Sequence, residues 1–256
     1  MELSQTIAIV TGGASGLGEA TTRRIVEAGG KVAIFDLNVE RGNALVRELG
    51  NDSVVYFQTN VADALQVEQH VAKVVEHFGQ VNVLVSCAGI ATPGKVVLQK
   101  GPLALSQFEQ VIQVNLVGTF NVLRVVAQCM QQNEPNEEGE RGVIINTASV
   151  AAFEGQIGQA AYSASKAGVV GMTLPIAREF ARDGIRVMAI APGLFETPLL
   201  DGLSEPARVA IASSVPFPNR LGKASEYALL VESIVRNSFL NGEVIRLDGA
   251  IRMQPR

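Results

Sequence analysis

Short apolar runs rich in Val and Ile alternate with amphipathic stretches along all 256 residues of the chain. Strands that are buried on both faces have this continuously apolar character, whereas half-exposed strands alternate apolar and polar residues. A chain that alternates such strands with helices folds into a parallel sheet covered by helices on both faces. We therefore predict a single α/β domain over residues 1–256 with a doubly wound, seven-stranded parallel sheet. The predicted strands are Ile7–Thr11, Lys31–Asp36, Val54–Gln58, Val81–Ser86, Gly142–Asn146, Ile185–Ile190 and Glu243–Leu247.

Helical patterns lie between these runs, among them Leu17–Ala28, Ala64–Phe78, Phe108–Gln131 and Ala161–Ala181. Three other segments break the alternation. Ligands of open α/β sheets bind outside the carboxyl ends of the strands. Ala91–Ser106 and Leu194–Pro218 leave from that edge, so we predict that they form substrate walls, the second as a lid. Gln131–Arg141 is acidic and turn-rich, which predicts a surface loop.

Charge and cysteine content exclude several other classes of protein. The 21 basic and 25 acidic residues give a net charge of −4, and no basic cluster suggests a nucleic-acid partner. The two cysteines, Cys87 and Cys129, are too few for a secreted disulfide framework. Neither a signal peptide nor an apolar run of about 18 residues is evident, so we expect a cytoplasmic protein with no membrane span. We interpret His70 and His77 as solvated residues and expect no metal.

A glycine-rich turn, Thr11–Gly18, joins the first strand to the first helix. Gly12 permits a tight turn, while Gly16 and Gly18 let the backbone approach a pyrophosphate at the helix N-terminus. Ser15 and Leu17 lie in the same turn and are predicted to contact the dinucleotide. On its own, the G-x-x-x-G-x-G spacing is equally compatible with a turn that binds no ligand.

Asp36 ends the second strand, 18 residues after Gly18. A carboxylate at this position accepts hydrogen bonds from the adenosine ribose and repels a 2′-phosphate. No arginine follows directly to hold such a phosphate, so the pattern favours NAD over NADP. A solvated strand-end residue is the alternative, and the register with the glycine turn favours the functional interpretation. Small residues at Cys87, Ala88 and Gly89 would let a cofactor cross the sheet edge, although tight packing alone would also explain them.

Tyr162 and Lys166 are spaced i, i+4, which places them on one face of a predicted helix. A lysine cation about 4 Å from the phenol could lower the tyrosine pKa by up to about 3 units. Tyr162 would then serve as the catalytic acid/base near neutral pH. A half-buried tyrosine beside a surface lysine on an amphipathic helix is the alternative, and the pair alone favours that alternative.

Two further polar residues complete a candidate catalytic set. Ser149 follows the fifth predicted strand, where its hydroxyl could hold a substrate oxygen, or could simply stabilise a turn. Asn115 lies in an otherwise apolar helix, and a buried amide needs a polar partner such as backbone, water or Lys166. It could therefore serve catalysis, structure or both.

Taken together, these residues resemble the short-chain dehydrogenases/reductases over essentially the whole chain. The resemblance rests on the Thr11–Gly18 turn, Cys87–Gly89, Asn115, Ser149, Tyr162, Lys166 and the Pro192–Gly193 turn. It implies a Rossmann-type fold, the cofactor NAD and catalysis by Asn115, Ser149, Tyr162 and Lys166. It also implies cofactor contacts from Tyr162 and Lys166 and from Asn60, Val61, Pro192, Gly193, Phe195 and Thr197. The implied substrate contacts are Ser149, Gln156 and Tyr162.

Longer strings resemble a branch of that family whose members oxidise 3-hydroxyacyl-CoA reversibly. They are Arg141–Gly155, Gly171–Ala177, Ala191–Leu200 and Phe239–Gln254. This branch implies a homotetramer and some tolerance of steroids and other secondary alcohols. Two departures affect specificity: Asn60 replaces the aspartate usual beside the adenine, and the lid stretch Asp201–Ser214 diverges. Another secondary alcohol as substrate, or a binding protein with a vestigial site, remains an alternative.

Overall fold

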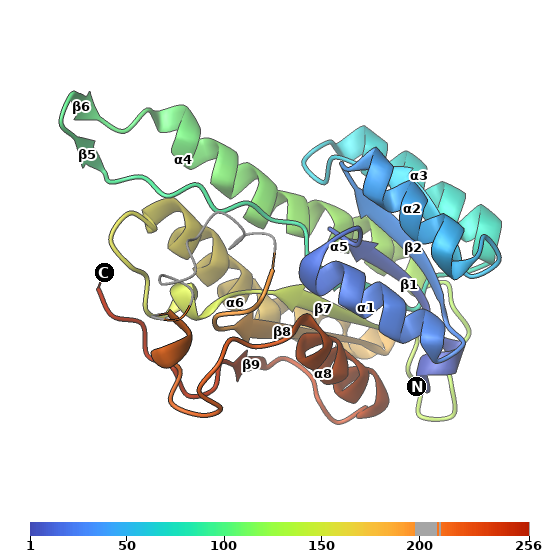
Figure 1. Ribbon diagram of the computed structural model, residues 1–256. Helices are drawn as coiled ribbons and strands as arrows, with labels where there is room; N and C mark the ends of the chain where they lie inside the picture. The colour runs from blue at the N-terminus through green and yellow to red at the C-terminus, as the bar shows by residue number, and fades with distance from the viewer. Residues whose placement is uncertain (198–208, 210, 256) are drawn as a thin grey trace.

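The computed structural model describes residues 1–197, 209 and 211–255. Its centre is one parallel sheet of seven strands in the order β3-β2-β1-β4-β7-β8-β9 (Figure 1). The predicted doubly wound sheet is confirmed, and every strand boundary lies within two residues of the prediction. The strands are β1 (Ile7–Thr11), β2 (Lys31–Asp36), β3 (Val54–Gln58), β4 (Val83–Ser86), β7 (Gly142–Thr147), β8 (Ile185–Pro192) and β9 (Val244–Leu247).

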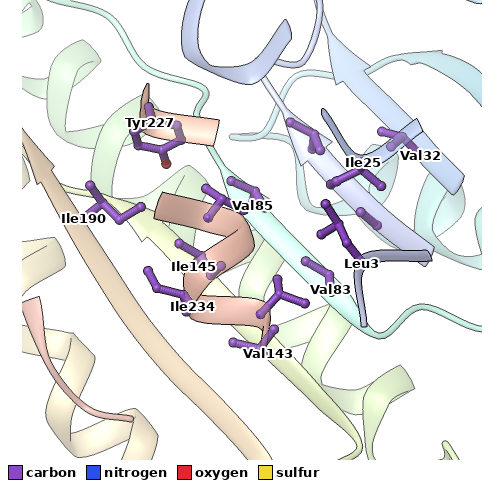
Figure 2. Packing of buried hydrophobic residues seen from close by; sticks show 14 of the residues in the cluster. Leu3, Ile25, Val32, Val83, Val85, Val143, Ile145, Ile190, Tyr227 and Ile234 are labelled. Atoms are coloured by element: carbon purple, nitrogen blue, oxygen red, sulfur yellow. The ribbon is translucent and has the colours of Figure 1, made fainter. Parts of the chain in front are cut away.

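Helices cover both faces of the sheet, as alternating elements require. One face packs against α1 (Gly16–Glu27), α2 (Val39–Leu49) and α8 (Ala224–Arg236). Figure 2 shows side chains of this layer, with Ile25 of α1 and Ile234 of α8 directed at the strands. The other face packs against α3 (Ala64–Phe78), α5 (Gly118–Met130) and α6 (Ala160–Phe180).

The predicted helix 108–131 begins earlier than expected and is interrupted. It consists of α4 (Leu105–Ile112), a π-helical turn η2 (Gln113–Val117) and α5. This stretch, Leu105–Met130, is long and apolar enough to cross a membrane by length and composition alone, and 56% of its most apolar window is buried against the rest of the protein. Packing therefore accounts for most of its apolar surface. The π-turn says more about function than the length of the helix does, because such turns frequently occur at functional sites.

The segment predicted as the first substrate wall contains a two-stranded antiparallel hairpin that the sequence patterns did not indicate. β5 (Val97–Leu98) pairs with β6 (Gly101–Pro102). The hairpin extends away from the sheet, beyond the N-terminal end of α4 (Figure 1). Val96 and Val97 are exposed. Strands of two residues are too short to show a periodic pattern, which explains why the prediction missed them. Three short 3₁₀ turns also lie among the described residues: η1 (Leu3–Gln5), η3 (Val150–Ala152) and η4 (Ala181–Asp183).

The predicted surface loop is confirmed except at one residue, and the prediction for His70 is wrong. The loop Gln131–Arg141 is largely exposed, but Glu140 within it is buried and bonded to Arg186 of β8, with Nε and Oε1 2.8 Å apart. His70 is half-buried rather than solvated: its Nδ1 lies 2.9 Å from Thr59 Oγ1, and its ring stacks on Phe57. His77 is exposed, as predicted. Among the described residues, no group of three His, Cys, Asp or Glu side chains could hold a metal ion.

Candidate functional site

The glycine turn between β1 and α1 has the shape that a closely bound phosphate requires. Gly12 and Gly16 have φ values of +64° and +53°, which favour glycine. A Cβ on Gly12 would meet Ala88 N of the β4 edge at 2.8 Å, and a Cβ on Gly18 would clash with Gly12 O. Each glycine therefore closes the turn against a backbone neighbour.

The N-terminus of α1 has free groups for an anion. Ser15 occupies the N-cap position, yet its side chain makes no capping hydrogen bond. The first N–H groups of a helix have no partner inside the helix, and they carry a partial positive charge. Leu17 lies in the first turn of α1 and packs against the core. The turn thus fits the pyrophosphate of a dinucleotide.

Asp36 connects the end of β2 to this turn. Its Oδ2 accepts from Ala14 N at 3.0 Å, and its Oδ1 accepts from Asn38 N at 2.9 Å. Tyr56 OH donates to the Asp36 carbonyl at 3.0 Å. The carboxylate therefore also shapes the glycine turn, a role that the sequence did not reveal. Its predicted contact with the ribose stays a prediction.

The predicted adenine contacts lie at the exposed end of β3. Asn60 Oδ1 accepts from Ala62 N at 3.1 Å, so the amide closes its own turn. Val61 is buried, and its carbonyl accepts from Asn121 Nδ2 of α5 at 2.8 Å. An adenine ring would therefore meet an amide whose oxygen is already bonded, which supports the prediction of an altered contact there.

The turn after β8 is packed against the end of β9. Gly193 N donates to Leu247 O at 2.9 Å, and a Cβ on Gly193 would meet Asp248 at 2.8 Å. Phe195 is buried and Thr197 half-buried. Residues 198–208 and 210 of the predicted lid Leu194–Pro218 lie outside the described residues, as does most of the divergent stretch.

Asn115 sits in the π-turn η2, fully buried. Its Oδ1 accepts from Ile90 N at 2.8 Å, and its Nδ2 donates to Ile90 O at 2.9 Å and to Ser165 Oγ at 3.1 Å. The side chain thus ties α4–α5 to the segment after β4 and to α6. Lys166 is not its partner, so the structural interpretation of Asn115 has direct support.

Ser149 and Tyr162 come together at the carboxyl edge of β7. Ser149 is buried, and its Oγ accepts from Ala151 N at 3.1 Å. Burial raises the pKa of the Tyr162 phenol above its ordinary value, and a hydrogen bond with Ser149 partly opposes that shift. The prediction that Lys166 lowers the Tyr162 pKa is therefore wrong for the protein without a cofactor, because desolvation disfavours the phenolate.

Lys166 explains that difference. Its Nζ donates to Thr147 O at 2.7 Å and lies 5.8 Å from the centre of the Tyr162 ring, so the ammonium is bonded to the strand end. Burial lowers the pKa of Lys166 from 10.5 to about 8. A buried cation poised near neutral pH is typical of functional sites. The two side chains share a helix face: the ammonium lies over the Tyr162 ring, but its hydrogen bond goes to Thr147 O rather than to the phenol oxygen.

Cys87 joins a buried cluster that the sequence patterns missed. Thr147 Oγ1 and Tyr227 OH lie 2.8 Å apart, and both approach Cys87 Sγ, at 3.6 Å and 3.7 Å. Burial raises the pKa of the Cys87 thiol, which together with its contacts to Thr147 and Tyr227 favours the packing interpretation. Tyr227 comes from α8, and no motif links it to β7. Ala88 N donates to Thr11 Oγ1 at 3.1 Å, and Gly89 leaves room for Asn115 and Lys166.

We predict that the buried Lys166 makes stability depend on pH. Its folded pKa of about 8 lies below the ordinary 10.5, so the unfolded chain binds more protons between these values. Stability should therefore rise with pH in that window. The unfolding free energy of the wild type, relative to Lys166→Met, should increase by about 2 kcal/mol from about pH 7 to about pH 9.5. Urea titrations at both pH values measure this difference, and a constant difference would contradict the prediction.

Comparisons with known proteins agree with this geometry. A family model described as short chain dehydrogenase matches residues 6–208. The chain is 58% identical over 251 residues to 3-hydroxyacyl-CoA dehydrogenase type-2 of Homo sapiens, covering 97% of this chain and 96% of the relative. It is 52% identical to the protein of the same name from Drosophila melanogaster over 255 residues, covering 99% and 100%. A crystal structure of 3-hydroxyacyl-CoA dehydrogenase type-2 from Mycobacterium avium has a TM-score of 0.93 at 43% identity, covering 98% and 97%. The chain therefore belongs to the short-chain dehydrogenase family of oxidoreductases, which use a nicotinamide dinucleotide.

Proposed function

We propose that this enzyme oxidises the secondary alcohol of a 3-hydroxyacyl-CoA reversibly to the 3-ketoacyl-CoA, with NAD as cofactor. The observation that carries the proposal is the convergence of Ser149, Tyr162 and Lys166 at the carboxyl end of β7, across from the glycine turn. The substrate class is supported by the names of relatives that are 52–58% identical over nearly the full chain.

We propose the following roles for the side chains, which their positions support. Ser149 and Tyr162 hydrogen-bond the substrate oxygen, and Tyr162 takes the hydroxyl proton during oxidation and returns it during reduction. Lys166 supplies positive charge beside the tyrosine and holds the cofactor ribose. The nicotinamide, when bound, accepts or donates the hydride. Asn115 maintains the shape of the site and passes the proton onward through water.

The site predicts the outcome of an activity test. With NADH, the wild type should reduce acetoacetyl-CoA, and Tyr162→Phe should lower kcat by at least about 10²-fold, as general acid catalysis contributes 10²–10⁴-fold. NADH binding, followed by its fluorescence, should be retained in the variant. A steroid ketone serves as the second substrate. If the steroid is reduced and the thioester is not, the enzyme acts on another secondary alcohol. NADH binding without any turnover would indicate a vestigial site.

The preference for NAD is supported by Asp36 and by the lack of an arginine directly after it. We predict that Asp36→Ala lowers the ratio of kcat/KM for NADH over kcat/KM for NADPH by at least about tenfold, since loss of one charge-assisted hydrogen bond removes about 1.5–3 kcal/mol. Because Asp36 also accepts from Ala14 N, affinity for both cofactors should fall. Initial rates with NADH and with NADPH measure this ratio, and an unchanged ratio would count against the role of Asp36 in cofactor preference.

We further propose a homotetramer, formed in part by the outer faces of α5 and α6. A groove of about 300 Å³ runs between these helices. Its lining is mixed: the apolar residues are Phe120, Leu123, Ala127, Ile176 and Phe180, and the polar ones are Arg124, Gln128, Gln131 and Glu179. Phe120 is 48% exposed although it lies on an apolar helix. A second copy of this chain, presenting the same face, would cover Phe120 by twofold symmetry.

The tetramer makes a testable prediction. Phe120→Glu places a charge in the centre of that face and should reduce the assembly to a smaller species, measured by sedimentation velocity. Leu229→Glu changes a similarly exposed residue on α8, outside the α5–α6 face, and serves as the control variant. A wild type that sediments as a monomer would refute the proposal.

Two remaining assignments rest on the sequence. We propose that residues 1–256 act as one domain with a substrate lid at 194–218, and that the enzyme works in the cytoplasm. The reduced thiols Cys87 and Cys129 support the second assignment.

A further inference from the structure

The residues after β9 return to the loop that separates Ser149 from Tyr162. Asp248 accepts from Ala250 N through Oδ1 at 3.0 Å and from Arg246 Nε through Oδ2 at 2.8 Å. Ala250 adopts φ = +65°, a conformation that non-glycine residues rarely keep unless their surroundings impose it. Ile251, which follows, is buried. The turn is therefore held in a strained shape that directs the chain toward residues 153–158.

Segment 251–255 then binds that loop at three successive points. Met253 N donates to Glu154 Oε2, Gln156 Nε2 donates to Gln254 O, and Ile157 N donates to Pro255 O, each at 3.0 Å. We call this segment the strap.

An ion pair reinforces the strap. Arg246 donates to both oxygens of Glu154, at 2.8 Å and 3.3 Å, and its guanidinium lies 5.5 Å from the centre of the Phe153 ring. These contacts hold the pKa of Glu154 below its ordinary value. The base of the β5–β6 hairpin holds the same loop from the other end, because Gly94 N donates to Gly158 O at 2.8 Å. The loop is thus restrained on both sides.

The strap fixes the carboxamide of Gln156, the residue for which the family resemblance implies a contact with substrate. One of its two N–H donors is bonded to Gln254 O. The second N–H and Oε1 have no partner among the described residues, and the side chain is only partly buried. An amide held in this way offers one donor and one acceptor in a defined orientation, as a thioester carbonyl and an amide N–H require.

We propose that the strap is a specificity-determining element that positions Gln156 to recognise acyl thioesters over ketones that lack a thioester. This inference rests on the proposed function and adds to it the residues that set substrate preference. Pre-positioning lowers the entropy lost on binding, so its effect should lie in KM rather than in kcat. The strap touches neither the tyrosine nor the lysine of the catalytic set, so the effect should be confined to substrate recognition.

The test compares a chain ending at Arg252 with the wild type, using NADH with acetoacetyl-CoA and with a steroid ketone. We expect KM for acetoacetyl-CoA to rise about fivefold, the equivalent of one neutral hydrogen bond, with kcat changed by less than about twofold. KM for the steroid and NADH affinity should stay within about twofold of wild type. Arg252→Gln is the matched control: it removes the ion pairs of a largely exposed arginine with Glu154 and Asp248 and its hydrogen bond to Ile251 O, but it keeps the three hydrogen bonds of the strap. It should therefore stay within about twofold of wild type.

A double-mutant cycle separates positioning from general loosening. If the strap acts through Gln156, shortening the chain in a Gln156→Leu background should add no further rise in KM. Hydrogen exchange at Ile157 should accelerate in the shortened chain, because its amide loses Pro255 O. Equal losses on both substrates, additive effects in the cycle, or no change in KM would each overturn the proposal. A wild type that reduces the steroid but not the thioester would instead refute the proposed function, and the thioester preference with it.

Discussion

A parallel sheet that is buried on both faces leaves polar groups few places to gather. Between the two helical layers, the strands β1, β4, β7 and β8 carry apolar side chains that water does not reach. Polar side chains therefore gather mainly at the two edges of the sheet: Arg186 pairs with Glu140 at the amino edge, and the carboxyl ends of all the parallel strands share the opposite edge. The glycine turn after β1, Cys87–Gly89 after β4, Ser149 after β7 and Gly193 after β8 meet there for that reason.

The same edge confines a cation. Lys166 reaches the end of β7 from α6. Desolvation there lowers the pKa of its ammonium, and the carbonyl of Thr147 is its one hydrogen-bond partner among the described residues. Tyr227 approaches the same strand from the opposite helical layer and meets Thr147. The two layers thus join at one residue of β7, and the position of the ammonium depends on the packing of α8 as well as α6.

Much of this could be predicted because periodicity and strand-end chemistry are local. The seven strands, the glycine turn, Asp36 and the set Asn115, Ser149, Tyr162 and Lys166 all follow from short patterns in sequence. The cluster of Cys87 with Thr147 and Tyr227 and the buried pair of Glu140 with Arg186 could not be predicted, since their partners lie far apart in the chain. The hairpin β5–β6 was missed for another reason: each of its strands has only two residues, too few to show a periodic pattern. The electrostatics were also misjudged: helical spacing placed Lys166 beside Tyr162, but it did not show that a carbonyl would take the ammonium or that burial would dominate the tyrosine pKa.

The central claim is that the carboxyl edge of β7 presents a phenol and a buried ammonium to the reactive end of a nicotinamide. A crystal structure of the enzyme with the oxidised dinucleotide tests it most directly. The account predicts the pyrophosphate at the N-terminus of α1, Lys166 Nζ on the ribose and the nicotinamide carbon that accepts hydride in contact with substrate beside Tyr162 OH. A dinucleotide bound elsewhere, or a nicotinamide turned away from Tyr162, would contradict it.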